Sequence, residues 1–212
     1  MGPLLEIDRE LFIFINNRMS SHEFDVVMPI ITDLHKQPIF WFLVAAIMIY
    51  AIFRPANRNG KNVPLLNRDL RKSRLKKWAH GLLIVALSMG LSDFVAYRAV
   101  KIWVQRDRPE AAGVSTILRV PSHSGWAFPS NHAANNFALA RTVQILAPQF
   151  AIPAYLFASA VGFSRVYVGV HYPMDVIGGG FIGFLCASLI NWIVAFGFRR
   201  FRSGEYSSHA RT

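Results

Sequence analysis

The sequence predicts an all-α protein, an integral membrane helical bundle of five to six transmembrane helices preceded by N-terminal interfacial helices. Two observations support this class. Hydrophobic residues make up 53% of the 212-residue chain, and they lie in long blocks rather than at the spacing of an amphipathic soluble helix. The formal net charge is +11, and its basic residues gather between and after those blocks, as in membrane proteins with basic flanks.

The first 37 residues fit no regular span. Leu11–Ile15 and Val26–Ile31 are apolar but short, and polar residues and Pro29 interrupt them. We expect interfacial or half-inserted helices on the external side of the membrane, and a sixth, irregular span is the alternative. Residues 1–37 are taken as the N-terminal part of a single membrane domain that covers residues 1–212.

The apolar blocks are the predicted membrane spans. A hydrocarbon core about 30 Å thick needs roughly 20 apolar residues in each helix. Two blocks reach that length, and the others reach it when flanking polar residues sit at the interface. In chain order the blocks are Ile39–Phe53, Trp78–Ala99, Ala133–Leu146, Ile152–Val170 and Val176–Phe198.

Basic residues predict the orientation of these spans. Residues 54–77 carry nine Lys and Arg against the single acid Asp69, and residues 199–212 carry four arginines. The positive-inside rule makes both the loop and the C-terminal tail cytoplasmic. The alternating spans then place residues 100–129 outside. We expect a multi-pass protein of the cytoplasmic (inner) membrane with its active site on the external, periplasmic face. The basic loop lacks interleaved aromatic residues, which argues against nucleic-acid binding.

The first external motif is "KIWVQRDRP". Lys101 and Arg108 are seven residues apart, which predicts one helix face, and Pro109 is expected to end that helix. Two long cations that project together at the membrane surface suit a phosphate. Snorkelling of basic side chains at a helix end is the alternative.

The second motif is "PSNH". Ser130 follows a proline and precedes an apolar helix, so it is predicted to be the N-cap, with Asn131 and His132 in the first turn. Unpaired backbone N–H groups and the positive end of the helix dipole make such a start suitable for an anion. A plain capped helix is the alternative reading of this motif alone.

The third motif is "SRVYVGVHYPMD". Arg165 lies near the external end of its span, and Pro173 suits the first position of the next helix. His171 precedes that helix and Asp175 falls in its first turn, so the carboxylate can reach the imidazole. Such a pair orients the ring and is expected to make it more basic. Together the three motifs supply the cations, nucleophile and acid that phosphoryl transfer needs.

These three motifs, in this order and spacing, resemble the signatures of the type 2 phosphatidic acid phosphatase family, and the match runs from Lys101 to Asp175. The resemblance implies a membrane phosphatase that needs no metal or cofactor. It implies that His171 attacks phosphorus, that Asp175 holds His171, and that His132 protonates the leaving group. The implied ligands of the phosphate oxygens are Lys101, Arg108, Arg165, Ser130 and the backbone N–H of Asn131. The family usually has glycine at the position of Asn131.

The predicted function is hydrolysis of a lipid phosphate monoester or pyrophosphate in the bilayer. Phosphatidic acid, phosphatidylglycerol phosphate, an isoprenyl pyrophosphate and a lipid A phosphate all remain open as substrates, and no oligomeric state is predicted. A lipid phosphotransferase would use the same residues. A non-catalytic binder or transporter would be expected to lack His171 or Asp175, and both are present. Deep in their spans, Asp93 and Arg141 are expected to form an ion pair.

Overall fold

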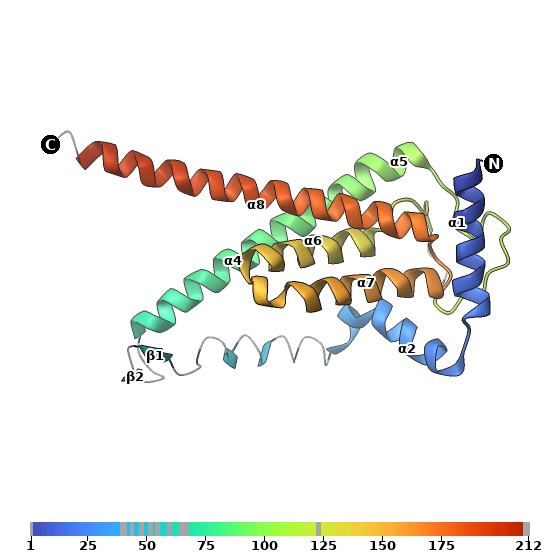
Figure 1. Cartoon of the computed structure of the whole chain (residues 1–212), viewed down its shortest axis with the longest axis horizontal. Coiled ribbons are helices and arrows are strands. Elements are labelled where there is room, and N and C mark those ends of the chain that lie inside the picture. The colour runs from blue at the N-terminus through green and yellow to red at the C-terminus, as the bar shows by residue number, and fades with distance from the viewer. Residues whose placement is uncertain are drawn as a thin grey trace. The chain divides into compact units, whose positions relative to one another are not determined.

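The computed structural model describes residues 2–38, 68–121 and 124–209, with a few further positions between 42 and 63. The regular elements among the described residues are helices apart from one short hairpin, in which β1 (Ala56–Arg58) pairs antiparallel with β2 (Lys61–Val63) (Figure 1). The helical class is therefore as predicted. The predicted span Ile39–Phe53 and the first part of the basic loop lie largely outside the described residues.

The chain divides into two compact units, one made of residues 1–32 and 84–212 and the other of residues 33–83. The second unit contains the 3₁₀ turn η2 (Leu34–Lys36), the hairpin and the start of α4 (Arg68–Phe94). The first unit contains all eight predicted site residues. Its remaining elements are α1 (Pro3–Ile13), η1 (Phe14–Arg18), α2 (His22–Thr32), η3 (Val95–Val100), α5 (Lys101–Val104), α6 (Asn131–Leu146), η4 (Pro148–Phe150), α7 (Ala151–Tyr167) and α8 (Pro173–His209).

Three helical stretches among the described residues are long and apolar enough to cross a membrane: Lys72–Val104, Pro148–Tyr167 and Pro173–Gly197. They correspond to three of the five predicted spans. The predicted span Ala133–Leu146 falls in α6, which has 16 residues, or about 24 Å at 1.5 Å per residue. The total of five to six spans stays a prediction.

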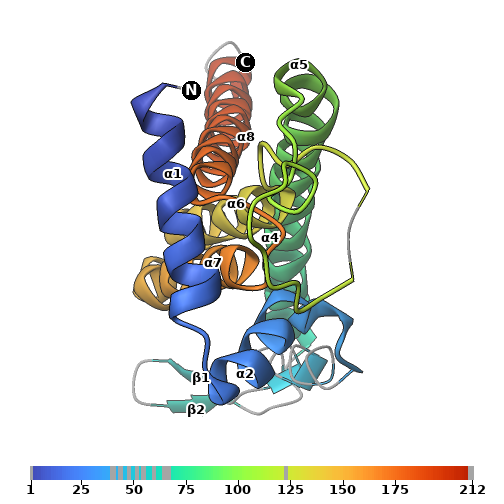
Figure 2. The same cartoon turned by 90° about the vertical axis from the view of Figure 1, so that its right-hand side faces the viewer.

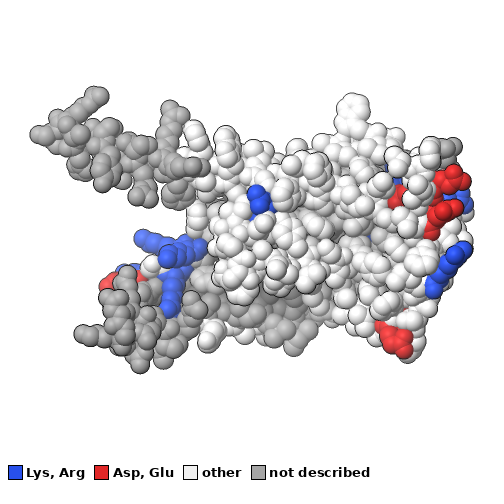
Figure 3. Space-filling view, viewed as in Figure 1, with Lys and Arg blue, Asp and Glu red and all other residues white. Residues whose placement is uncertain are grey.

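The surfaces of α7 and α8 are those expected of helices in contact with lipid. Large apolar side chains point outward along both, and the face in Figure 3 over α6, α7 and α8 is nearly free of charge. The exposed residues include Ile152, Leu156, Ile177, Phe181, Leu185 and Trp192. Because water would penalise so much apolar surface, the bundle suits a hydrocarbon environment.

Close packing of α6 against α8 depends on two glycines spaced four residues apart. A Cβ on Gly183 would collide with the backbone carbonyl of Ala134, and one on Gly179 with the carbonyl of Ser130. Small residues at this spacing let two helix backbones approach closely. The contact sets the start of α6 against the first turns of α8, where two of the three motifs lie.

Helix α1 lies across the end of the bundle formed by α6, α7 and α8 (Figures 1 and 2). One of its acids is buried, while several of its apolar side chains are exposed. Asp8 is buried at 1% exposure, whereas Leu4, Ile7 and Leu11 are exposed. The 11 residues of α1 and the 11 of α2 are too few to span a bilayer. Both are short helices, as predicted for the N-terminal region.

The predicted ion pair between Asp93 and Arg141 is wrong. Arg141 donates to Ser188 Oγ at 2.9 Å and to Gln144 Oε1 at 2.8 Å, and its guanidinium lies over the ring of Phe184. Asp93 accepts hydrogen bonds from side-chain amides at the start of α6 instead. Arg141 lies ten residues beyond Asn131 along α6, or about 15 Å. Asp93 and Arg141 therefore each use nearer partners.

Candidate active site

The three motifs meet at one end of the first unit, where α5 and α7 end and α6 and α8 begin (Figure 1). Six of the eight predicted residues are buried: Lys101, Arg108, Ser130, Arg165, His171 and Asp175. Asn131 and His132 are partly exposed in the first turn of α6. Arginine and lysine are rarely buried without a counter-charge or ligand, so three buried cations at one place indicate a site for an anion.

His171 lies on the short link between α7 and α8 and is 2% exposed. Its Nδ1 is 3.5 Å from Oδ2 of Asp175, so the carboxylate faces the ring as the spacing of four predicts. Nδ1 makes no hydrogen bond to any group in the described part of the chain. The two groups therefore face each other, with the imidazole slightly beyond a normal hydrogen-bond distance from the carboxylate.

The pKa of His171 is lowered well below its usual value, mainly by burial and then by the charges of Arg165, Arg108 and Lys101. The sequence led us to expect a more basic ring because of Asp175. That expectation is wrong for the ligand-free site, because desolvation and three nearby cations both disfavour the imidazolium. The ring is held neutral at pH 7, the form that keeps a lone pair for nucleophilic attack.

Asp175 is held by partners that sequence reasoning missed. Its Oδ1 accepts from Arg106 Nη1 at 2.9 Å, and its Oδ2 accepts from the backbone N–H of Tyr172 at 2.8 Å. Arg106 also pairs with Asp8 at 2.7 Å, and its guanidinium lies 3.9 Å from the centre of the Tyr172 ring. Arg106 thus fixes the carboxylate that faces His171.

Helix α1 closes this network. Asp8 pairs with Arg106 and accepts the backbone N–H of Met174, in the first turn of α8, at 2.8 Å. A carboxylate at that position satisfies an otherwise unpaired donor at the helix start and interacts favourably with the helix dipole. No signal in the sequence pointed to this pairing, because Asp8 is one of four charged residues in the 11-residue helix α1.

The prediction that Lys101 and Arg108 share one helix face is wrong. Helix α5 ends at Val104, and Gln105 adopts a left-handed conformation with φ 46°, four residues before Pro109. Arg108 therefore lies outside the helix, where Nε donates to the carbonyl of Gly125 at 2.9 Å and Nη1 to that of Val170 at 2.7 Å. These bonds tie the first motif to the third.

The three cations reach the site from different elements. Arg165, near the end of α7, donates through Nη1 to Thr32 Oγ1 at 3.0 Å. Lys101 interacts electrostatically with Arg108, Arg165 and Asp175. Burial also lowers the pKa of Arg108 from its usual value. Like charges gathered in a buried place repel one another, and a bound anion relieves that repulsion.

Ser130 is the N-cap of α6, as predicted. Its side chain accepts from the N–H of Ala133 at 3.5 Å, and its own N–H donates to the backbone carbonyl of Asp175 at 2.9 Å. This second bond joins the start of α6 to the start of α8. Asn131 occupies the first helical position, and its side-chain Nδ2 donates to Asp93 at 2.9 Å. The amide is therefore directed toward α4.

A second polar cluster holds part of the loop between α5 and α6 in place. Arg119 pairs with Asp25 and donates to the carbonyl of Tyr167 at 2.9 Å, while the Tyr167 hydroxyl donates to Asp25 at 2.6 Å. The pKa of Asp25 is lowered by the hydrogen bonds from Tyr167 and Arg119. Asn16 adds bonds to the carbonyls of Ile117 and Tyr167. The N-terminal helices are thus attached to the loop beside the site.

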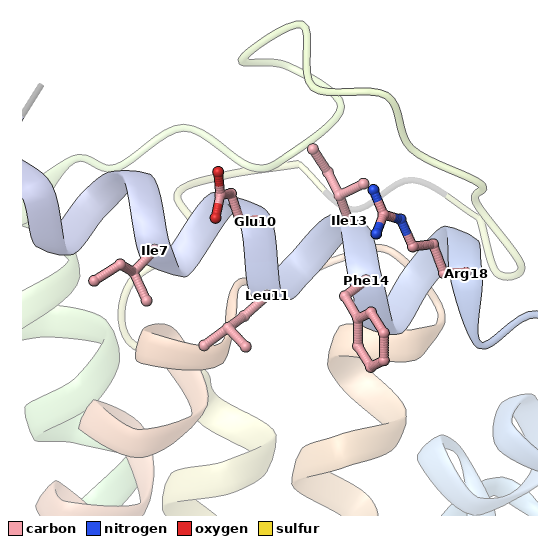
Figure 4. Close-up of a pocket in the computed structure, with 6 residues that line it drawn as sticks. All are labelled: Ile7, Glu10, Leu11, Ile13, Phe14 and Arg18. Atoms are coloured by element: carbon pink, nitrogen blue, oxygen red, sulfur yellow. The ribbon is translucent and has the colours of Figure 1, made fainter.

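A groove among the described residues lies elsewhere. Its volume is about 560 Å³, and it follows α1 and η1 (Figure 4). The lining residues are Ile7, Glu10, Leu11, Ile13, Phe14 and Arg18. None of the eight predicted site residues is among them. Within the described ranges, no three His, Cys, Asp or Glu side chains gather as metal ligands.

Two proteins of known activity have sequences similar to that of this chain. Decaprenylphosphoryl-5-phosphoribose phosphatase of Mycolicibacterium smegmatis is 34% identical over 100 residues, which cover 44% of this chain and 51% of that protein. The chain thus spans about half the length of that relative. Lipid A 4'-phosphatase of Bacteroides thetaiotaomicron is 26% identical over 187 residues, which cover 85% of this chain and 73% of that protein.

A solved structure shares the fold. The crystal structure of Aquifex aeolicus LpxE aligns with a TM-score of 0.61 and 23% identity, over 85% of this chain and 92% of that one. Residues 81–199, more than half of the chain, match the PAP2 superfamily. That range contains all three motifs and the helices that carry them. The chain is a member of the PAP2 superfamily.

Proposed function

We propose that the chain is an integral membrane lipid phosphatase that hydrolyses a lipid phosphate monoester or pyrophosphate through a phosphohistidine at His171, without a metal ion. The observation that carries the proposal is the burial of three cations around a neutral histidine that faces Asp175. Membership of the superfamily supports it. The names of both curated relatives describe phosphatases of lipid-linked molecules.

The proposed reaction has two steps. Nδ1 of His171 faces Asp175, so Nε2 attacks phosphorus, and the bond from phosphorus to the lipid oxygen breaks as His132 donates a proton to that oxygen. Water then attacks phosphorus as His132 takes back a proton from it, the P–N bond breaks, and inorganic phosphate leaves. Lys101, Arg108, Arg165 and the start of α6 neutralise the charge on the equatorial oxygens, which is where such a site provides most of its catalysis.

The proposed location follows from charge and surface together. The basic loop and the C-terminal tail lie in the cytoplasm, and the site opens at the external face of the inner membrane. A site at the end of an apolar bundle suits a substrate whose tail stays in the bilayer.

The test is phosphate release in detergent with EDTA present, from a panel of lipid phosphates and pyrophosphates. The wild type is compared with His171→Ala and with Glu10→Gln, a control in the α1 groove. Release by the wild type and the control, with a loss of at least about a thousandfold in His171→Ala, supports the proposal. Release that survives His171→Ala, or that EDTA abolishes, contradicts it. Transfer of phosphate to an added alcohol instead of water would identify a phosphotransferase.

A further inference from the structure

A carboxylate on the membrane-spanning stretch Lys72–Val104 lies beside the candidate site and has no part in the proposed reaction. Asp93 is exposed, and its Oδ1 accepts from Asn131 Nδ2 at 2.9 Å and from Asn135 Nδ2 at 3.5 Å. An ionisable residue within a membrane span is costly in lipid and usually marks a functional position. The ion pairs in the described part of the chain do not include Asp93.

Asp93 lies near the residue that is proposed to protonate the leaving group. Asn131, its closer partner, lies between the N-cap Ser130 and His132, which is proposed to protonate the leaving oxygen. Asp93 also interacts electrostatically with Lys101. The carboxylate is therefore next to both the phosphate cradle and the place where the alcohol half of the substrate would lie.

Asp93, Asn131 and Asn135 together present hydrogen-bond acceptor oxygens. Because a carboxylate accepts hydrogen bonds, both amides must turn their N–H groups toward Asp93, and their carbonyl oxygens then point away. Those two oxygens, Oδ1 of Asn131 and Oδ1 of Asn135, are buried and have no hydrogen-bond partner among the described protein groups. A buried acceptor without a partner is unfavourable, because it has lost its hydrogen bonds to water. A hydroxyl or ammonium group that reaches the cluster would be bound.

We propose that Asp93, Asn131 and Asn135 form a head-group subsite that accepts hydrogen bonds from the alcohol half of the substrate. This inference rests on the proposed function and narrows its substrate class. The preferred substrates are lipid phosphates whose leaving alcohol carries a hydroxyl or ammonium group near the phosphate, as in polyol, sugar or amino-alcohol lipids. Lipids whose leaving alcohol carries no donor, such as a diacylglycerol or a polyprenol, are poorer substrates.

The subsite also gives a role to Asn131, which stands where the type 2 phosphatidic acid phosphatase family usually has glycine. Glycine has no amide to orient the carboxylate. In this chain the Asn131 side chain is drawn toward α4 by Asp93, while its backbone stays helical and leaves the N–H at the start of α6 in place.

The experiment compares kcat/KM for matched lipids in detergent. Lysophosphatidic acid carries a free 2-hydroxyl next to the phosphate ester, its 2-deoxy analogue lacks it, and sphingosine 1-phosphate supplies an ammonium group. The wild type is expected to prefer lysophosphatidic acid over the deoxy lipid by about tenfold or more, because a hydrogen bond to a charged group is strong. Asp93→Asn and Asn135→Ala are expected to bring that ratio close to one, while Glu10→Gln keeps it.

The ratio of two substrates in one preparation does not depend on how much of a variant is folded. Equal kcat/KM for the hydroxyl and deoxy lipids in the wild type would overturn the subsite and leave the phosphatase intact. A preference that Asp93→Asn and Asn135→Ala both retain would overturn it too. A wild type that releases phosphate from other lipids of the panel but from none of these three would overturn the subsite, whereas release from no lipid of the panel would overturn the proposed function itself. Sphingosine 1-phosphate favoured over lysophosphatidic acid in the wild type, and not in Asp93→Asn, would support the subsite and assign it to an ammonium group.

Discussion

The charges around His171 determine its protonation state. Burial, followed by Arg165, Arg108 and Lys101, lowers the pKa of the ring well below its usual value. The same cations attract a phosphate, and a bound dianion offsets their effect on the histidine. The site is thus arranged so that the free chain keeps a neutral nucleophile and the bound anion compensates the cations.

The first prediction concerns pH and stability. An unfolded histidine has a pKa of about 6.5, and the folded value is lower, so the folded chain binds fewer protons between the two. The free energy of unfolding is therefore greatest above about pH 6.5 and falls as the pH drops toward the folded pKa, by up to about 1.4 kcal/mol per pH unit. Thermal unfolding of His171→Gln in detergent should depend less on pH below about 6.5 than that of the wild type. Parallel curves would show that His171 does not cause the dependence.

The second prediction concerns Arg106, which holds Asp175 without touching the substrate. Arg106→Gln is expected to lower kcat by about 10- to 100-fold, a range found when a partner of an orienting carboxylate is lost, with a smaller change in KM. The acid limb of the pH–rate profile should also move, because without Arg106 the Asp175 carboxylate would be free to interact more strongly with the His171 ring. Arg98→Gln, an exposed position on η3, is the matched control. An unchanged pH profile in an Arg106→Gln chain that has lost activity would indicate a role in folding alone.

At this scale the motifs predicted which residues gather and not what holds them. All eight predicted residues lie in the first unit, where α5 and α7 end and α6 and α8 begin. The partners Asp8 and Thr32 come from helices more than 90 residues away in the chain, and no local spacing predicts such pairs. Arg106 lies within the quoted first motif, but a cation in a basic motif does not show that it serves a carboxylate.

At the scale of elements, the site depends on how closely α8 approaches α6. Gly179 and Gly183 face the backbone of α6, and the N–H of Ser130 bonds the carbonyl of Asp175. The helix starts that carry the second and third motifs are thus held by one interface.

The third prediction tests that interface. In Gly183→Ala the new methyl group would meet the carbonyl of Ala134, so we expect a loss of about 3 kcal/mol in stability together with a loss of activity. In Gly90→Ala the methyl group meets nothing within 4 Å, and alanine favours a helix by about 1 kcal/mol. Unfolding of both variants in detergent provides the comparison. Equal stability of the two variants would contradict the close contact.

The helices themselves were largely predictable, because caps and prolines mark their starts. Ser130 and Pro173 begin α6 and α8 where the sequence indicates. The end of α5 was not predictable from the sequence. Gln105 carries no signal for a left-handed turn, and Pro109 is the expected helix terminator. The turn is explained by tertiary bonds of the following chain, such as those from Arg108 to Gly125 and Val170.

At the scale of the whole molecule, the proposed function depends on orientation in the membrane. The helical stretch Lys72–Val104 has 33 residues, with basic residues near its first end and the predicted site residue Lys101 near its last. That length, about 50 Å, exceeds the membrane core, so its two ends must face different sides if it spans.

The fourth prediction concerns this orientation. In a Cys186→Ser background, Ala111→Cys on the external loop and Ser73→Cys near the start of α4 give single thiols at exposed positions. A maleimide that cannot cross membranes should label residue 111 in intact cells and residue 73 after lysis. The reverse pattern would place the site in the cytoplasm and contradict the positive-inside assignment.

The most direct test of the central claim is to trap the covalent intermediate. Wild-type protein in EDTA is mixed with a lipid phosphate in a single turnover and quenched with alkali, in which phosphohistidine survives, and its peptides are analysed by mass spectrometry. The account predicts a phosphoryl group on His171 that forms before inorganic phosphate appears and then decays, with neither event in His171→Ala. A phosphoryl group on another residue, or phosphate release at the wild-type rate by His171→Ala, would contradict it.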